Sequence, residues 1–225
     1  MIKWVAMILL ALAAPAAAQV APSAAEIKAY TGLHAAAAKG DVPEIDKLAK
    51  AGAPIDARDS NGRTPLHVAI FLHHGNAARA LLRHGANPNA LDAQRYDIVT
   101  IAAVADDIDM LKLALAGGCQ ATNITSPYDG TALIAAAHLG HDEVVRTLIA
   151  AKAPLDHVNN LGWTAVIESI VLGDGGKRHV ATLEALVKAG ANLNLADRSG
   201  ATPLTLAKSR GYTEMVKILE AGGAR

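Results

Sequence analysis

The chain has 225 residues, enough for one domain of ordinary size or for an elongated array of smaller units. Its 21 basic and 21 acidic side chains give a formal net charge of zero and form no long block of one sign. A nucleic-acid surface needs a basic face to neutralise phosphates, so we expect no nucleic-acid partner.

The N-terminal residues 1–18 are predicted to be a cleavable signal peptide. Lys3 precedes an apolar run over residues 4–14, Pro15 breaks that run, and small residues lead to a cleavage site after Ala18. The run is short for a membrane span, which makes an uncleaved anchor the weaker alternative, and no later segment is apolar for long enough to cross a bilayer. Its alanine-rich style is typical of bacteria, so we expect export to the periplasm and no membrane insertion after cleavage.

From residue 31 onward the sequence repeats itself. Segments similar to TPLHVA recur at intervals of 33 to 38 residues, beginning at Thr31, Thr64, Asp97, Thr131, Thr164 and Thr202. A second marker, seen as HGANPN from His84 and AGANLN from Ala189, keeps the same phase. Two markers with one period indicate an array of stacked units. We therefore assign residues 19–30 to a lead-in and residues 31–225 to one repeat domain.

Each unit is predicted to contain two helices. The first begins near the threonine and carries small residues that let neighbouring helices approach closely, namely Ala36, Ala69, Ala102, Ala136 and Ala207. A glycine that can adopt positive φ then makes a turn, at Gly40, Gly140, Gly173 or Gly211. A second helix with an apolar stripe follows, as over residues 144–149, and a polar hairpin leads to the next unit.

These residues resemble the ankyrin repeat. The features that match the family pattern are the 33-residue period, TPLH at Thr64–His67, the pair Gly140 and His141, and the GA-x-x-N ends at Gly85 and Gly190. The resemblance implies an all-α solenoid of about six helix-turn-helix units with projecting β-hairpin loops. It also implies a concave face formed by the hairpins and the first helices. The polar sixth unit is interpreted as a C-terminal cap, so we expect a monomer.

The histidines admit a structural and a metal-binding interpretation. His67 ends TPLH, where the resemblance implies hydrogen bonds to the nearby threonine and backbone, and His73 and His74 occupy turn positions. His138 and His141 are three residues apart, a spacing that could place two imidazoles on one helical face. No nearby Cys, Glu or third His completes a ligand set, so we predict no metal site. Binding of a metal or small molecule through these histidines is kept as the alternative function.

No enzyme signature is present in the sequence. A G-x-S-x-G nucleophile elbow and an H-E-x-x-H zinc helix are both missing. The loop from Gly173 to His179 lacks the Walker spacing and is interpreted as a flexible insertion within the fifth unit. The single cysteine, Cys119, excludes an internal disulfide and occupies a small, buried position in the repeat, typical of an inert packing residue. We predict no catalytic residue and no cofactor.

The predicted binding surface combines the ends of the first helices with the residues that precede each unit. Only seven residues are aromatic, and four of them fall at or beside these positions. Aromatic and arginine side chains are the usual anchors of protein interfaces. The candidate partner-binding residues are Arg63, Phe71, Leu72, Arg95, Tyr96, Tyr128, His138, Leu139, Trp163, Val171 and Leu172. We expect a non-catalytic module that binds an unidentified exported protein in the groove of units two to five, unless Phe71 and Leu72 only thicken the core.

Overall fold

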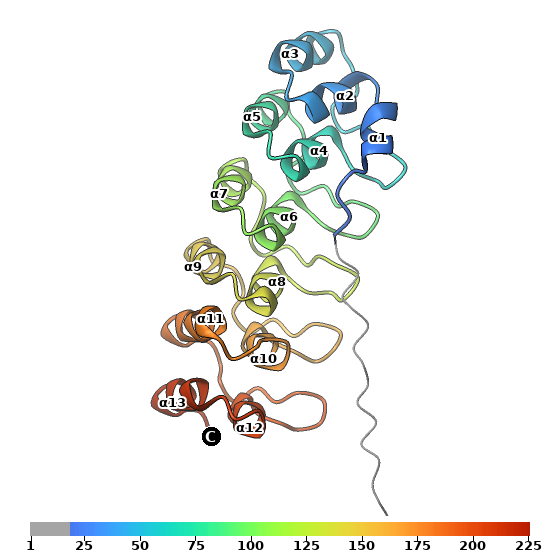
Figure 1. The fold of residues 1–225 in the computed structure, drawn as a ribbon. Coiled ribbons are helices and arrows are strands. Elements are labelled where there is room, and N and C mark those ends of the chain that lie inside the picture. Colours follow the sequence, from blue (N-terminus) through green and yellow to red (C-terminus); the bar gives the residue numbers. More distant parts are fainter. Residues whose placement is uncertain (1–18) are drawn as a thin grey trace, which may run out of the picture.

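The computed structural model describes residues 19–225, which form thirteen helices. After a short first helix the others alternate between two rows, and Figure 1 shows the rows stacked side by side with loops projecting from one edge. The row of first helices contains α2 (Gly32–Lys39), α4 (Pro65–Phe71), α6 (Ile98–Val104), α8 (Ala132–Leu139), α10 (Ala165–Val171) and α12 (Pro203–Ser209). The row of second helices contains α3 (Val42–Lys50), α5 (Gly75–Arg83), α7 (Ile108–Ala116), α9 (Asp142–Ala150), α11 (Lys177–Lys188) and α13 (Thr213–Ala221). The predicted all-α solenoid of about six helix pairs is confirmed.

In units two to six the predicted starts of the first helices are set by capping side chains, whereas Thr31 in the first unit makes no such cap. The Thr64 hydroxyl accepts a hydrogen bond from the His67 backbone N–H, and the threonines at 131, 164 and 202 accept equivalent bonds. In the third unit Asp97 takes over this role, because its Oδ1 accepts from the Thr100 N–H at 2.8 Å. The departure from threonine in this unit therefore preserves the cap.

His67 has the structural role predicted for it. Its Nδ1 lies 2.8 Å from the Thr64 hydroxyl, and its Nε2 lies 3.2 Å from the Tyr96 carbonyl oxygen in the next unit. The ring is fully buried, and this burial lowers its pKa, so it is neutral near pH 7. His34 repeats the arrangement in the first unit, with Nε2 2.9 Å from the Arg63 carbonyl oxygen. Each histidine thus joins one unit to the next.

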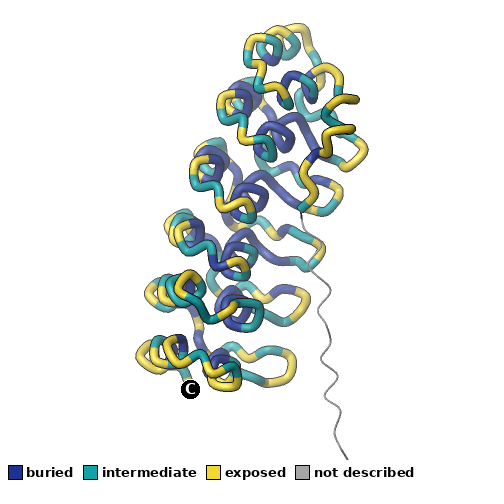
Figure 2. Tube along the Cα trace, viewed as in Figure 1, coloured by how far each residue is buried: buried dark blue, intermediate teal, exposed yellow. Residues whose placement is uncertain are grey.

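The core runs along the stack where the two rows of helices meet. Figure 2 shows the buried backbone concentrated in the first helices and in the inner sides of the second helices. The predicted small residues Ala36, Ala69, Ala102, Ala136 and Ala207 are all buried, and the fifth unit has Ser169 at this place. The Ser169 hydroxyl donates to the Val166 carbonyl oxygen at 2.8 Å, which satisfies its polar group inside the core.

The projecting loops of neighbouring units are joined by both backbone and side-chain hydrogen bonds. The N–H groups of Ala93, Ser126 and Asn160 each donate to a carbonyl oxygen of the preceding loop at 2.9 Å. Among residues 19–225 the only isolated β-bridge joins Thr125 and Gly130, so the expected β-hairpins are tight loops with almost no strand character.

The lead-in contains a helix that the sequence analysis did not predict. α1 (Ala24–Ala29) begins with a reciprocal capping box between Ser23 and Glu26. It is attached to the loop of the second unit by ion pairing between Glu26 and the buried Arg63. The predicted signal peptide, residues 1–18, lies outside the described residues. Across residues 19–225 no helix is long and apolar enough to cross a membrane.

The five-residue insertion of the fifth unit is tied to the units on both sides. His179 Nε2 lies 2.9 Å from the His138 carbonyl oxygen, and Arg178 pairs with Asp106 of the third unit at 2.7 Å. On the other side Tyr212 donates its hydroxyl to the Gly173 carbonyl oxygen at 2.9 Å. The positive φ expected at Gly173 is found at Gly175 instead, because the insertion moves the turn along the chain.

Because the turn of the fifth unit lies at Gly175, we expect Gly175→Ala to destabilise the protein more than the matched change Gly211→Ala in the sixth unit. Both glycines have positive φ, +69° and +71°, so alanine costs about 1–2 kcal/mol at either position. At Gly175 a Cβ would also lie 2.6 Å from the Tyr212 ring, whereas at Gly211 it meets nothing within 4 Å. Urea unfolding should show at least about 1 kcal/mol of additional loss for Gly175→Ala. Equal losses would mean that Tyr212 moves aside freely.

Candidate protein-binding surface

The predicted apolar residues at the ends of the first helices form a row across successive units. Phe71 and Leu72 at the end of α4 are half-buried and pack against the core, and Val171 and Leu172 at the end of α10 are also half-buried. Leu139, which ends α8 between them, is 39% exposed. We call the ends of α4, α6, α8 and α10, together with the loops that precede these helices, the candidate face.

Two residues predicted to contact a partner are buried inside the protein. Arg63 is 1% exposed and is held by ion pairs with Glu26 and Asp59, while Tyr96 is 6% exposed. Placing Arg63 and Tyr96 on an accessible surface was therefore wrong. For Arg63 the cause is the lead-in, which contacts its guanidinium through Glu26 and the Val20 carbonyl oxygen.

The other predicted loop residues are at least partly accessible. Trp163 and Tyr128 are half-buried, and Arg95 is exposed, with its guanidinium 2.7 Å from Asp129. Three further apolar residues of the loops before α8 and α10 are exposed although the sequence analysis did not select them: Ile124, Val158 and Leu161. Ile124 and Val158 occupy equivalent places, immediately before the residues whose N–H groups close the two loops.

An acidic residue that was not selected from the sequence lies beside the candidate face. Glu168 lies in the middle of α10 and is 5% exposed. The Asn159 side-chain amide donates to its Oε1 at 2.7 Å, and His138 Nδ1 from the preceding unit lies 3.6 Å from its Oε2. The sequence does indicate this residue by its position in the repeat. The other five units carry only apolar residues at the same place: Ala35, Val68, Ile101, Ala135 and Leu206.

Burial acts against the charge on both members of this pair. It raises the pKa of Glu168 to about 7, although the hydrogen bond from Asn159 opposes the shift. Burial, together with the nearby His179 and His141, lowers the pKa of His138. The two groups are therefore a carboxyl group that ionises only near neutral pH and an imidazole that is neutral there. Groups whose pKa values are perturbed in this way are concentrated at functional positions.

Comparison with known proteins identifies the family. A family model described as ankyrin repeats in three copies matches residues 7–92 and 99–197, and a second model of ankyrin repeats in many copies matches residues 175–220. The chain belongs to the ankyrin-repeat family. Ankyrin repeat proteins generally act as non-catalytic modules of protein–protein interaction.

Bacterial ankyrin repeat proteins are among the most similar relatives. The chain is 32% identical to the ankyrin repeat protein YahD of Escherichia coli over 190 residues, covering 84% of this chain and 94% of that protein. An ankyrin repeat domain from Acinetobacter baumannii has 44% identity and a TM-score of 0.81, covering 86% of this chain and 98% of that one.

More distant relatives share the ankyrin fold in other contexts. The structure of a predatory endopeptidase from Bdellovibrio bacteriovorus in complex with an immunity protein contains a chain with the same fold. That match has 24% identity and a TM-score of 0.71, and covers 85% of this chain and 98% of that one. The human ankyrin repeat and SOCS box protein 16 is 28% identical over 193 residues, and the match covers 84% of this chain but only 42% of that protein.

The histidines that were considered as metal ligands form hydrogen bonds with backbone carbonyl oxygens or lie next to a single acidic side chain. His141 Nδ1 lies 2.9 Å from the Ala103 carbonyl oxygen, and His74 Nε2 lies 3.1 Å from the Ala38 carbonyl oxygen. His73 has a φ of 57°, the left-handed turn conformation expected for it. Within residues 19–225 no group of three or more His, Cys, Asp or Glu side chains is placed to hold a metal ion. Cys119 is buried, which raises its pKa and keeps the thiol protonated.

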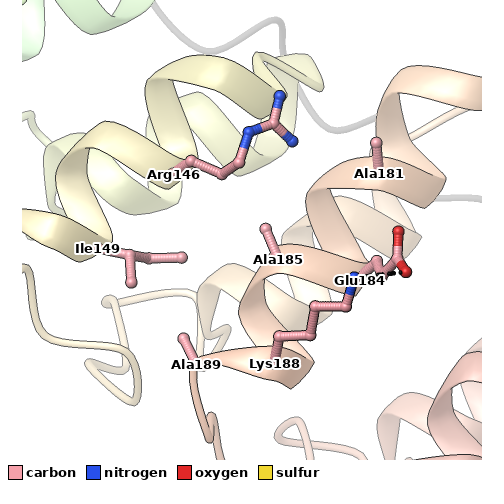
Figure 3. Close-up of a pocket in the computed structure, with 7 residues that line it drawn as sticks. All are labelled: Arg146, Ile149, Ala181, Glu184, Ala185, Lys188 and Ala189. Atoms are coloured by element: carbon pink, nitrogen blue, oxygen red, sulfur yellow. Dashed lines mark ion pairs between the residues drawn. The ribbon is translucent and has the colours of Figure 1, made fainter.

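A shallow hollow lies in the opposite layer of the ankyrin stack, between the second helices of the fourth and fifth units. It has a volume of about 310 Å³. Figure 3 shows Arg146 and Ile149 of α9 on one side, and Glu184 and Lys188 on α11, which pair with each other at 2.9 Å. Its α11 wall is otherwise alanine, so few groups in it could orient a ligand. Its position separates it from the candidate face.

Proposed function

We propose that the protein is a non-catalytic binding module that holds a partner protein in the concave groove of units two to five. The observation that carries this proposal is the row of apolar side chains at the ends of the first helices. Leu139, at the centre of this row, is exposed to solvent. A rigid stack presents such a row without first having to order it, which limits the entropy lost on binding. Apolar residues grouped on one face mark interaction sites more often than scattered ones do.

The loops of the fourth and fifth units would extend this contact surface. Trp163 and Tyr128 are large and only half-buried, and Ile124 and Val158 are exposed on neighbouring loops. Arg95 would add a polar contact at the edge, because its partner Asp129 is itself accessible. Aromatic anchors surrounded by polar groups are the usual composition of a protein interface.

We further propose that the partner is met in the periplasm. This part rests on the signal peptide predicted for residues 1–18. Expression with a C-terminal tag, followed by cell fractionation and N-terminal sequencing, tests it. A mature chain that begins near Gln19 in the periplasmic fraction is the expected result, and an intact chain in the cytoplasm would contradict it.

Leu139→Glu should abolish partner capture while leaving the fold intact. The side chain is 39% exposed, so glutamate is tolerated in the monomer but places a charge in the middle of the apolar contact. Ala150→Glu is the matched control, because it adds the same charge to an exposed site on the second helix of the same unit. Tagged proteins would be used to capture partners from a periplasmic extract, with mass spectrometry of what elutes.

The expected result is a protein recovered with wild type and Ala150→Glu but reduced at least tenfold with Leu139→Glu. Circular dichroism of all three proteins checks that the helices are retained. A partner captured equally by Leu139→Glu would place the binding surface elsewhere on the stack.

A further inference from the structure

One carboxylate oxygen of Glu168, beside the candidate face, has no hydrogen-bond donor among residues 19–225. Glu168 Oε1 accepts from Asn159, whereas Oε2 accepts no hydrogen bond from residues 19–225. The atom opposite Oε2 is Nδ1 of His138, and the 3.6 Å between them is too long for a hydrogen bond. Glu168 Oε2 is not among the fully buried polar atoms without a partner, so it is reachable from solvent and can accept a hydrogen bond from an external donor.

The surroundings of Glu168 are suited to an aliphatic chain that ends in a donor. Val171 and Leu172 follow Glu168 by three and four residues, so they lie on the same side of α10. Leu139 follows His138 directly and is exposed beside it. Thus the acidic group lies at the inner end of an apolar surface shared by the fourth and fifth units.

We propose that Glu168 and His138 form the receptor for a lysine side chain of the partner protein. In this arrangement the lysine ammonium donates to Glu168 Oε2 and His138 Nδ1, while the aliphatic stem lies on Leu139 and Leu172. A donor nitrogen about 2.8 Å from each acceptor fits between two atoms 3.6 Å apart. The inference rests on the proposed function, since it names the chemical group that the same face receives.

Lysine fits these acceptors better than arginine does. Arginine binds carboxylates best through two parallel hydrogen bonds, and Asn159 already occupies Oε1. An ammonium group is a compact charge that can donate in several directions, so it suits one carboxylate oxygen and one imidazole nitrogen. Long lysine stems also cover apolar surface while the charged end finds a polar partner.

The protonation of the pair agrees with this assignment. His138 is neutral near pH 7 because burial lowers its pKa, so it can accept a hydrogen bond instead of repelling a cation. Among residues 19–225 no basic group comes near enough to Glu168 to offset the cost of its burial, which raises the pKa of that carboxyl group to about 7. An incoming ammonium would supply the missing positive charge.

The test uses random peptides displayed on phage, selected against the purified protein at pH 7.5. A selected peptide is synthesised with its lysine retained, or replaced by norleucine or by arginine. Dissociation constants are measured by fluorescence anisotropy on wild type, Glu168→Gln and Leu139→Glu. Glu143→Gln, an exposed glutamate on α9, serves as the charge control.

The expected result is a shared lysine whose replacement by norleucine weakens binding to wild type at least tenfold. Arginine should restore only part of that loss. Glu168→Gln should weaken the lysine peptide by the same factor and leave the norleucine peptide unaffected, whereas Glu143→Gln should change neither.

Peptides that depend on Leu139 but bind Glu168→Gln as tightly as wild type would overturn the lysine receptor and leave the proposed function standing. Peptides without a shared lysine would do the same. Failure to recover any peptide that depends on Leu139 would overturn the proposed function, and the lysine receptor with it.

Discussion

Glu168→Gln should raise the free energy of unfolding by about 3 kcal/mol above pH 7. Burial raises the pKa of Glu168 from 4.5 to about 7, so between these values the folded chain holds a proton that the unfolded chain has released. The folded state therefore binds more protons in this window, and its stability falls as the pH rises from 4.5 to 7. Glutamine has no proton to lose, so the variant escapes this fall.

Chemical denaturation at pH 4.5 and pH 8 would measure the effect. The difference between Glu168→Gln and wild type should be close to zero at the lower pH and about 3 kcal/mol at the higher pH. The groups that face the carboxyl group, Asn159 and His138, are both neutral at pH 8, so neither compensates an ionised Glu168. The control Glu143→Gln should change stability by less than about 0.5 kcal/mol at both values.

A gain that is the same at both pH values would show that the glutamine improves packing and that Glu168 ionises without cost. If the pH-dependent gain is found, the wild-type residue destabilises its own fold at neutral pH. Residues that stabilise less than a simple substitute are expected at binding sites, where the cost is offset when the ligand is present. The stability and peptide experiments thus measure two consequences of one uncompensated charge.

Most of the fold could be predicted because its determinants are local and recur. Thr64 at the start of a helix and Gly40 at a turn act through backbone groups within a few residues of themselves. The same local pattern occurs in six units. The third unit could therefore be recognised although it has Asp97 in place of threonine. By contrast, α1 is short and depends on Glu26 meeting an arginine far along the chain, which no local pattern reveals.

The exposure of the candidate residues could be predicted less well, because it depends on what the neighbouring units cover. Trp163 and Arg63 have equivalent places in their units, yet Trp163 is half-buried while the lead-in and its own loop enclose Arg63. Residue type alone could not separate these cases. Glu168 was missed for a different reason, since no motif contains it. Comparing the six units position by position would have shown a carboxylate where the fold otherwise places apolar side chains.

Arg63→Met should lower the free energy of unfolding by about 3–5 kcal/mol at neutral pH. The arginine side chain is 1% exposed, and its Nε lies 2.7 Å from an oxygen of Asp59, which is itself 6% exposed. The guanidinium also pairs with Glu26 and donates to the Val20 carbonyl oxygen at 3.2 Å. Methionine preserves the length and apolar contacts of the side chain but leaves a buried carboxylate without its cation, so the loss reflects charge and not a cavity.

The size of this loss should depend on pH. Burial raises the pKa of Asp59, but hydrogen bonds from Tyr30 and Arg63 outweigh that effect and hold the pKa below its ordinary value. A depressed carboxyl pKa stabilises the folded state above the unfolded value, and this contribution disappears as the pH falls through the folded value. The difference between Arg63→Met and wild type should therefore be largest near pH 7 and should shrink towards pH 3.

Arg95→Met is the matched control for this experiment. Arg95 also pairs with an aspartate of a projecting loop, but both side chains are about half exposed, and such surface pairs contribute about 0–1 kcal/mol. Trypsin provides a second measurement, because the exposed Lys28 in α1 should be cut faster in Arg63→Met if the arginine holds the lead-in. Equal stability of the two variants would mean that the buried charges of Arg63 and Asp59 contribute no net stability. Equal cleavage rates would mean that α1 is held by its other contacts.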